Sequence, residues 1–150
     1  MPDREDDIEE WSPQGPVTEL SDARSWALVT GATFGRIGVS VDDQPEIFPV
    51  NYFSNGSAIV FRTASGTKLT ELMTNKTVVF EVDASTDEGT WSVTVKGTAH
   101  AVTDDFEVPD AAFTALPDWV PTEPYVFVHI TPTSIVGRLF HHHVKLARRD

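Results

Sequence analysis

Three observations predict a mainly β fold, a small antiparallel barrel of five or six strands with short helices beside it. Runs of β-branched and aromatic residues recur between residues 33 and 140, separated by Asp, Asn, Gly and Pro. Few stretches have the spacing of a helix. Closing such strands into a barrel also removes exposed sheet edges.

Length and composition fit one domain with its own core, since the chain has 150 residues of which 40% are hydrophobic. Eleven Lys and Arg against 23 Asp and Glu give a formal charge of −12, which disfavours nucleic acid and anionic membranes as partners. Cysteine is absent, so any redox chemistry needs a cofactor. The acidic start is unlike a signal peptide, and we expect a cytoplasmic protein.

Two parts of the chain differ in composition. Residues 1–16 are rich in charge, proline and glycine, which predicts a flexible acidic arm, while residues 17–150 form the domain. The domain starts with "LSDARSWALVTGA", in which Ser21 is a helix N-cap and Gly31 a C-terminal stop. Apolar residues Ala23, Trp26, Ala27 and Val29 recur between them, which predicts a short amphipathic helix.

Three strands and a second helix are expected next. The first two strands are residues 33–41 and 46–56, joined by a tight turn at "DDQP". Asn55-Gly56 is a strong hairpin signal and leads into a third strand, residues 57–64. A helix follows at about residues 66–75.

The rest of the chain predicts three more strands. Residues 76–84 and 90–103 are the fourth and fifth strands, joined by the turn "STDEG". Residues 109–116 predict a short helix, and residues 123–140 a long sixth strand bent at Pro132.

Several strands are apolar on both faces, as in "IVF", "TVVFEV" and "YVFVHI". One small barrel interior cannot hold all of these side chains, so a second buried surface is needed, and a homodimer interface is the simplest one. The alternative is that the helices cover these faces.

The stretch "VFRTASGTKLTEL", residues 60–72, passes from a strand into a helix and predicts an anion site. It supplies two cations, three hydroxyls and a glycine: Arg62, Thr63, Ser65, Gly66, Thr67 and Lys68. Alternatively, Ser65 only caps the helix and the cations pair with surface carboxylates. The stretch matches neither GxxxxGK[ST] nor GxGxxG, which leaves a monophosphate at the rim of the barrel.

Residues 35–83 with "WSVTVKGTA" resemble the pyridoxamine 5′-phosphate oxidase-like flavin-binding split barrels, especially the short bacterial branch with nitroimidazole-resistance-type reductases. The resemblance implies a six-stranded split barrel that forms a homodimer with FMN at the subunit interface. It implies that Arg62, Thr63, Thr67 and Lys68 hold the FMN phosphate while Ser65 and Gly66 shape the loop. The resemblance further assigns to the flavin site the strand residues Pro49, Val50, Asn51 and Tyr52, and also Trp91 and Ser92.

The residues themselves leave some of these roles open. Tyr52 and Trp91 are as readily explained by packing in a core or an interface. His100 and His129 lie in strands and are satisfied core or edge side chains, or else proton donors near neutral pH. The run His141–His143 belongs to a basic tail more readily than to a metal site. No catalytic residue and no metal ligand is identified.

The resemblance implies an FMN-dependent oxidoreductase that passes electrons or hydride to a small organic acceptor, with a nicotinamide as one potential donor. The C-terminal segment "SIVGRLFHHHVKLARRD" lacks the arginine-rich substrate segment of the true pyridoxamine 5′-phosphate oxidases, so that activity is not expected. Two alternatives stay open: a deazaflavin-dependent reductase and a non-enzymatic flavin-binding protein.

Overall fold

The computed structural model describes residues 17–64, 66–102 and 125–141, without the side chains at positions 67, 68 and 125. The predicted acidic arm of residues 1–16 and the predicted helix at residues 109–116 lie outside the described residues.

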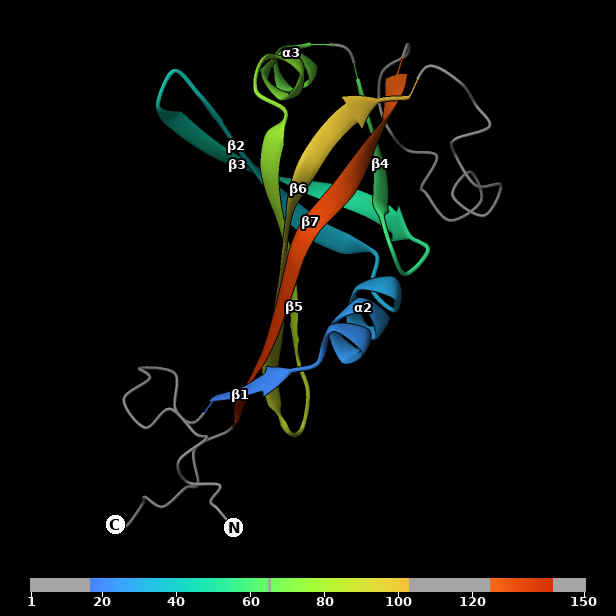
Figure 1. The fold of residues 1–150 in the computed structure, drawn as a ribbon, viewed down its shortest axis with the longest axis vertical. Helices are drawn as coiled ribbons and strands as arrows, with labels where there is room; N and C mark the ends of the chain where they lie inside the picture. The colour runs from blue at the N-terminus through green and yellow to red at the C-terminus, as the bar shows by residue number, and fades with distance from the viewer. Residues whose placement is uncertain (1–16, 65, 103–124, 142–150) are drawn as a thin grey trace.

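The described residues form a mainly β domain (Figure 1). Every strand predicted from the sequence is present, and so are the helices predicted near residues 21–31 and 66–75. The strands are β1 (Val17–Leu20), β2 (Phe34–Val41), β3 (Gln44–Ser54), β4 (Ile59–Ala64), β5 (Thr77–Ser85), β6 (Gly89–Ala101) and β7 (Tyr125–His141), and the helices are α2 (Asp22–Thr30) and α3 (Thr67–Thr74).

The strands pair in the order β1-β7-β4-β3-β2-β5-β6, and an additional β6–β7 pairing brings the two ends of this order together. The sheet therefore curls into a partial barrel of six strands, which confirms the expected fold class. The seventh strand, β1, was not predicted. It pairs with residues 137–140 of β7, beyond the part that pairs with β4.

Two pairs of neighbouring strands in the barrel share only short hydrogen-bonded ladders. The β3–β4 ladder ends at the pair of Tyr52 with Phe61, and the β2–β5 ladder covers only Arg36 to Gly38 of β2. By contrast, β6 and β7 pair along nearly their whole length. Their register shifts by one residue where Gly97 pairs with Pro132, so the bend expected at Pro132 coincides with a β-bulge.

Each helix begins and ends near the expected residues. Ser21 accepts a hydrogen bond from the Arg24 amide as the N-cap of α2, and Gly31 follows its last turn. Within α2, Ser25 and Val29 are buried, whereas Ala27 is exposed. Neither of the described helices is long and apolar enough to cross a membrane.

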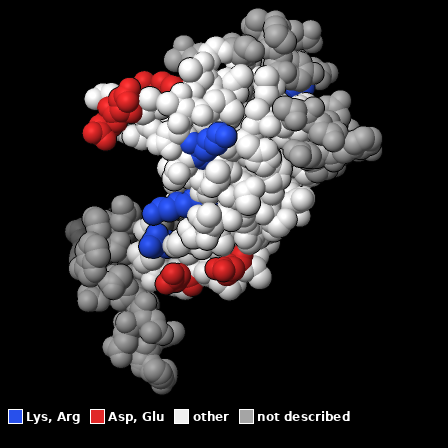
Figure 2. Space-filling view, turned by 45° about the horizontal axis from the view of Figure 1, so that its top comes forward, with Lys and Arg blue, Asp and Glu red and all other residues white. Residues whose placement is uncertain are grey.

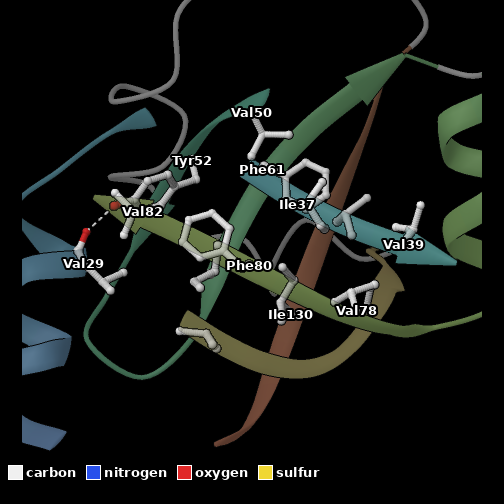
Figure 3. Packing of buried hydrophobic residues seen from close by; sticks show 14 of the residues in the cluster. Val29, Ile37, Val39, Val50, Tyr52, Phe61, Val78, Phe80, Val82 and Ile130 are labelled. Carbon is white, nitrogen blue, oxygen red and sulfur yellow. Dashed lines mark hydrogen bonds between the residues drawn. The ribbon is translucent and has the colours of Figure 1, made fainter. Parts of the chain in front are cut away.

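The core fills the barrel with branched and aromatic side chains from β2 to β7 and from both helices (Figure 3). Phe80 and Tyr52 meet edge to face with ring centroids 4.8 Å apart. Leu72 of α3 is fully buried in the same cluster. A second, smaller cluster lies on the opposite face of the sheet, where Val60 and Phe127 are buried.

The β2–β3 hairpin projects beyond the rest of the sheet (Figure 1). Its turn is Asp42-Asp43, where both residues have positive φ, 54° and 62°, as two-residue hairpin turns require. Acidic side chains gather at this tip (Figure 2), and exposed Ile47 lies nearby on β3. Asn55-Gly56 instead belongs to a longer connection, in which Asn55 Oδ1 accepts hydrogen bonds from the Ser57 and Ala58 amides.

Candidate functional site

The predicted phosphate loop connects β4 to α3 at one end of the barrel (Figure 1). Arg62 is half-buried near the end of β4, and its guanidinium carbon lies 5.9 Å from the centroid of the Phe127 ring. Thr63 follows on β4 and is also half-buried. Ser65 lies outside the described residues, and the positions of the Thr67 and Lys68 side chains are not described.

The start of α3 is suited to an anion. Its N-cap is Gly66, which has φ +155° and supplies no side-chain hydrogen bond to the first turn. This differs from the alternative in which Ser65 is the cap. An added Cβ at Gly66 would meet no atom within 4 Å, so there is room next to the first turn. The backbone N–H groups of that turn point toward the N-terminus, where a helix favours negative charge.

The stretch from Pro49 to Tyr52 presents two different faces. Val50 and Tyr52 are buried in the core, while Pro49 and Asn51 lie on the other face of β3. The Tyr52 amide donates to Thr33 O, on the β2 side. The backbone groups of Asn51 therefore point to the opposite side, toward the place where the β3–β4 ladder has ended.

The Tyr52 side chain faces away from that opening. Its hydroxyl donates a 2.6 Å hydrogen bond to the Val29 carbonyl of α2 (Figure 3). Burial raises the pKa of Tyr52 well above its usual value. The hydroxyl is therefore a structural donor within this chain, and neither the side chain nor the amide of Tyr52 is left for a ligand on the far side of the sheet.

Trp91 and Ser92 lie far from the phosphate loop in the same chain. Arg62 pairs with Phe127 of β7, whereas Trp91 pairs with Leu139 of the same strand. These two positions on β7 are separated by roughly 40 Å of strand, at about 3.3 Å per residue. The Trp91 side chain is buried in the core. One chain does not bring all of the expected site residues together.

Ser92 belongs instead to a charged cluster that was not predicted from the sequence. Its hydroxyl donates to Glu81 Oε2 over 3.2 Å. Arg36 Nη1 lies 2.7 Å from Glu81 Oε1 and 3.2 Å from Asp83 Oδ2. Burial raises the pKa of Glu81, and nearby Asp83 raises it further, while Ser92 and Arg36 oppose this. Glu81 and Asp83 are two residues apart on β5 and therefore lie on the same face of the strand. Only the pairing of β2 with β5 shows that Arg36 lies opposite Glu81.

Two histidines lie on the same face as Arg62. His100 of β6 pairs with His129 of β7, and their ring centroids are 4.9 Å apart. The sequence places both in strands but does not show that they meet. At the other end of β7, His141 Nε2 lies 2.7 Å from Thr18 Oγ1, while residues 142 and 143 lie outside the described part.

Taken together, the loop end of the barrel offers a cation, a helix start and exposed strand backbone on one side of the sheet. The cation and the helix start suit a phosphate. The backbone groups of β3 and the rings next to Arg62 suit a flat group with hydrogen-bonding edges. These residues fit a flavin nucleotide.

Comparison with known proteins agrees with this geometry. The family described as Pyridoxamine 5′-phosphate oxidase matches residues 21–139. A crystal structure from Corynebacterium glutamicum, provisionally named as such an oxidase, is 37% identical with a TM-score of 0.75, covering 85% of this chain and 100% of that one. An FAD binding protein from Mycobacterium smegmatis is 36% identical with a TM-score of 0.68, covering 83% and 98%.

The fold also extends to more distant proteins. A structure from Bacteroides thetaiotaomicron, provisionally named as a 5-nitroimidazole antibiotic resistance protein, is 13% identical with a TM-score of 0.68. It covers 83% of this chain and 87% of its own. The match over residues 21–139 shows that the chain belongs to the pyridoxamine 5′-phosphate oxidase-like family of split barrels.

Proposed function

We propose that this protein binds FMN and acts as an FMN-dependent oxidoreductase that reduces a small organic acceptor. The observation that carries the proposal is the passage from β4 into α3, where Arg62 precedes a helix whose N-cap, Gly66, has no side chain and open space beside it. A phosphate at this point gains from the helix start and from the guanidinium.

The phosphate would be held by Arg62, Thr63, Thr67 and Lys68, with Ser65 and Gly66 forming the turn around it. The backbone of Asn51 and its neighbours on β3 would hydrogen-bond the polar edge of the ring, because those groups face the end of the β3–β4 ladder. When bound, the flavin supplies hydride transfer. The protein binds and orients it, and the apolar side chains nearby exclude water.

The proposed assembly is a homodimer with two symmetry-related sites. In one chain, Trp91 and Ser92 lie roughly 40 Å of strand away from Arg62. A partner subunit could supply Ser92 and its neighbours to the site. Exposed Ile47 and Phe34 offer apolar surface for such an interface.

FAD is a second candidate cofactor. The M. smegmatis protein that is 36% identical over most of its length is described as an FAD binding protein. FAD carries the same riboflavin with an additional phosphate and adenosine, so the cation and helix start described above would serve either molecule.

The first experiment is an absorption spectrum of the purified protein after incubation with excess FMN, or FAD, and desalting. Retained flavin bands that bleach on anaerobic addition of NADH or NADPH would support the oxidoreductase. Retained bands that do not bleach would favour a purely flavin-binding role. If a deazaflavin is retained and neither FMN nor FAD is, the cofactor assignment is wrong.

A double substitution, Arg62→Ala with Lys68→Ala, tests the residues. We expect FMN affinity to fall by about 10²-fold or more, since charge-assisted hydrogen bonds contribute roughly 1.5–3 kcal/mol each. Arg24→Ala with Lys76→Ala is the matched control, because both side chains are exposed away from β4 and the change in net charge is the same. Equal affinity in the two double variants, measured by fluorescence titration, would contradict the phosphate assignment.

A further inference from the structure

His100 and His129 lie side by side on β6 and β7, and the Thr131 hydroxyl lies beside the His129 ring. The rings of His100 and His129 are tilted by 32° to each other, and both side chains are half-buried. Thr131 Oγ1 lies 3.5 Å from His129 Nδ1. Two paired strands and a hydroxyl therefore fix the position of the His129 ring more closely than an exposed histidine would be fixed.

His129 is a diagonal neighbour of Arg62. Arg62 pairs with Phe127, and His129 follows Phe127 by two residues on the same face of β7. Diagonal neighbours in a sheet have Cα atoms about 7–8 Å apart, within reach of long side chains. A ligand held by Arg62 that extends over β7 therefore meets the Phe127 ring and then His129, with His100 behind it.

The surroundings of the pair are apolar. Val60 of β4 lies directly opposite His129 and is 4% exposed, and Phe127, two residues away on β7, is 8% exposed. Phe53 of β3 and Val102 after β6 pack against these two side chains. Electrostatic interactions in such poorly hydrated surroundings are stronger than they are in water.

The described residues place one charged side chain beside the pair. From β4 it is faced by Arg62, and on β6 and β7 the flanking positions in the described residues are Thr98, Val102, Phe127 and Thr131, which carry no charge. From β3 it is faced by Phe53 and Asn51, also uncharged. In the described part of this face, the two imidazoles are thus the side chains beside Arg62 that can both donate and accept a proton.

We infer that His129 is the proton donor for reduction of the acceptor at this site, and that His100 is a positioning residue which holds the His129 ring. The inference rests on the proposed function. A reduced flavin supplies a hydride, which is two electrons and one proton. An acceptor that takes a hydride becomes an anion. The His129 imidazolium gives its ring proton to that anion, which completes a two-electron, two-proton reduction, and the imidazole regains a proton from water.

Two electron acceptors distinguish proton donation by His129 from a general effect of this residue on the flavin or on the fold. p-Benzoquinone needs two electrons and two protons, whereas ferricyanide takes one electron and no proton. In His129→Gln loaded with FMN, we expect oxidation by p-benzoquinone to slow by about 10²-fold, the lower end of the usual contribution of a general acid. Oxidation by ferricyanide should be unchanged. His141→Gln is the matched control, because it removes a histidine at the far end of β7.

The second measurement does not depend on turnover. The midpoint potential of bound FMN, measured anaerobically against pH, should show an inflection where His129 loses its proton, in the wild type and in His141→Gln. His129→Gln should lose that inflection. His100→Gln should keep it at a shifted pH, since it removes only the support for the His129 ring.

Several results would overturn the inference. Equal slowing with both acceptors would mean that His129 acts on the flavin or the fold in general. An unchanged inflection in His129→Gln, or an unchanged rate with p-benzoquinone, would remove its role as a proton donor. A wild-type protein that retains no flavin would overturn the proposed function itself, before any histidine variant is compared.

Discussion

Glu81 shows how the sheet changes the chemistry of a single residue. Its carboxyl lies between Arg36 and Ser92 on the face of the sheet opposite the core, and burial is the largest cause of its raised pKa. A carboxyl whose folded pKa exceeds its unfolded value favours folding when protonated. This contribution is fully present below its ordinary pKa of 4.5 and is lost as the pH rises through the folded pKa.

Glu81→Gln should therefore change how stability depends on pH. The amide resembles the protonated carboxyl, so the wild type should gain free energy of unfolding relative to the variant as the pH falls from 7 toward 4.5. Urea denaturation at several pH values measures this difference. Asp87→Asn, in the exposed β5–β6 turn, is the control for loss of one charge. A constant difference between wild type and Glu81→Gln across this range would contradict the effect of burial.

At the scale of residues, local pattern predicted the site only in part. Arg62 and Gly66 could be identified because a strand, a glycine and a helix follow one another in the chain. The Arg36–Glu81 pair could not, because its partners are 45 residues apart and meet only through the β2–β5 register. Tyr52 illustrates the opposite difficulty: it lies on β3 as predicted, but alternation along β3 turns its side chain into the core.

Among the elements, α2 is held against β7 by an unusually close contact. A Cβ at Gly137 would overlap Ser25 Oγ, and Ser25 is fully buried while its hydroxyl donates to Ser21 O. The apolar spacing predicted this helix, but its buried face includes a serine because β7 has no side chain at the point of approach. Small size, and not hydrophobicity, decides which face of α2 packs there.

Gly137→Ala should destabilise the protein by roughly 1–3 kcal/mol, the usual cost of overpacking a close contact. Adding Ser25→Ala should recover part of this loss, because it removes the nearer of the atoms that the new methyl group meets. Urea denaturation of both single variants and the double variant gives the coupling energy. Strictly additive effects would mean that the helix moves away from β7 instead of being held by this contact.

Strand β1 could not be predicted because it has no pattern of its own. Its four residues, "VTEL", are half-exposed or exposed. They form a strand because the edge of β7 is not paired beyond Ile130 on the β4 side and accepts a short partner at residues 137–140. Such a strand depends on tertiary context, whereas β5 and β6 have long alternating patterns and were predicted nearly to their ends.

For the molecule as a whole, the separation of the loop from Ser92 makes a prediction about the assembly. If each flavin site combines the loop of one subunit with Ser92 of the other, neither Arg62→Ala/Lys68→Ala nor Ser92→Tyr should bind FMN as a homodimer. A mixed dimer, purified through two different tags, should bind one FMN, because one of its two sites is intact.

A mixed dimer with no FMN would mean that both sets of residues act within one chain. A Ser92→Tyr homodimer that binds FMN would mean that Ser92 has no part in the site. Sedimentation of the wild-type protein at micromolar concentration provides the first check, since a monomer would contradict the proposed interface. Far-UV circular dichroism of Ser92→Tyr controls for folding, because Ser92 also bonds to Glu81.

The position of β7 in the chain has a consequence for how the protein is made. This 17-residue strand pairs with β1, β4 and β6, yet it is synthesised after all of them. Until it leaves the ribosome, the earlier strands have open edges that can join other chains. Closure then depends on pairing residues as distant as Val17 and Phe140, so we expect slow folding and a need for chaperones during translation.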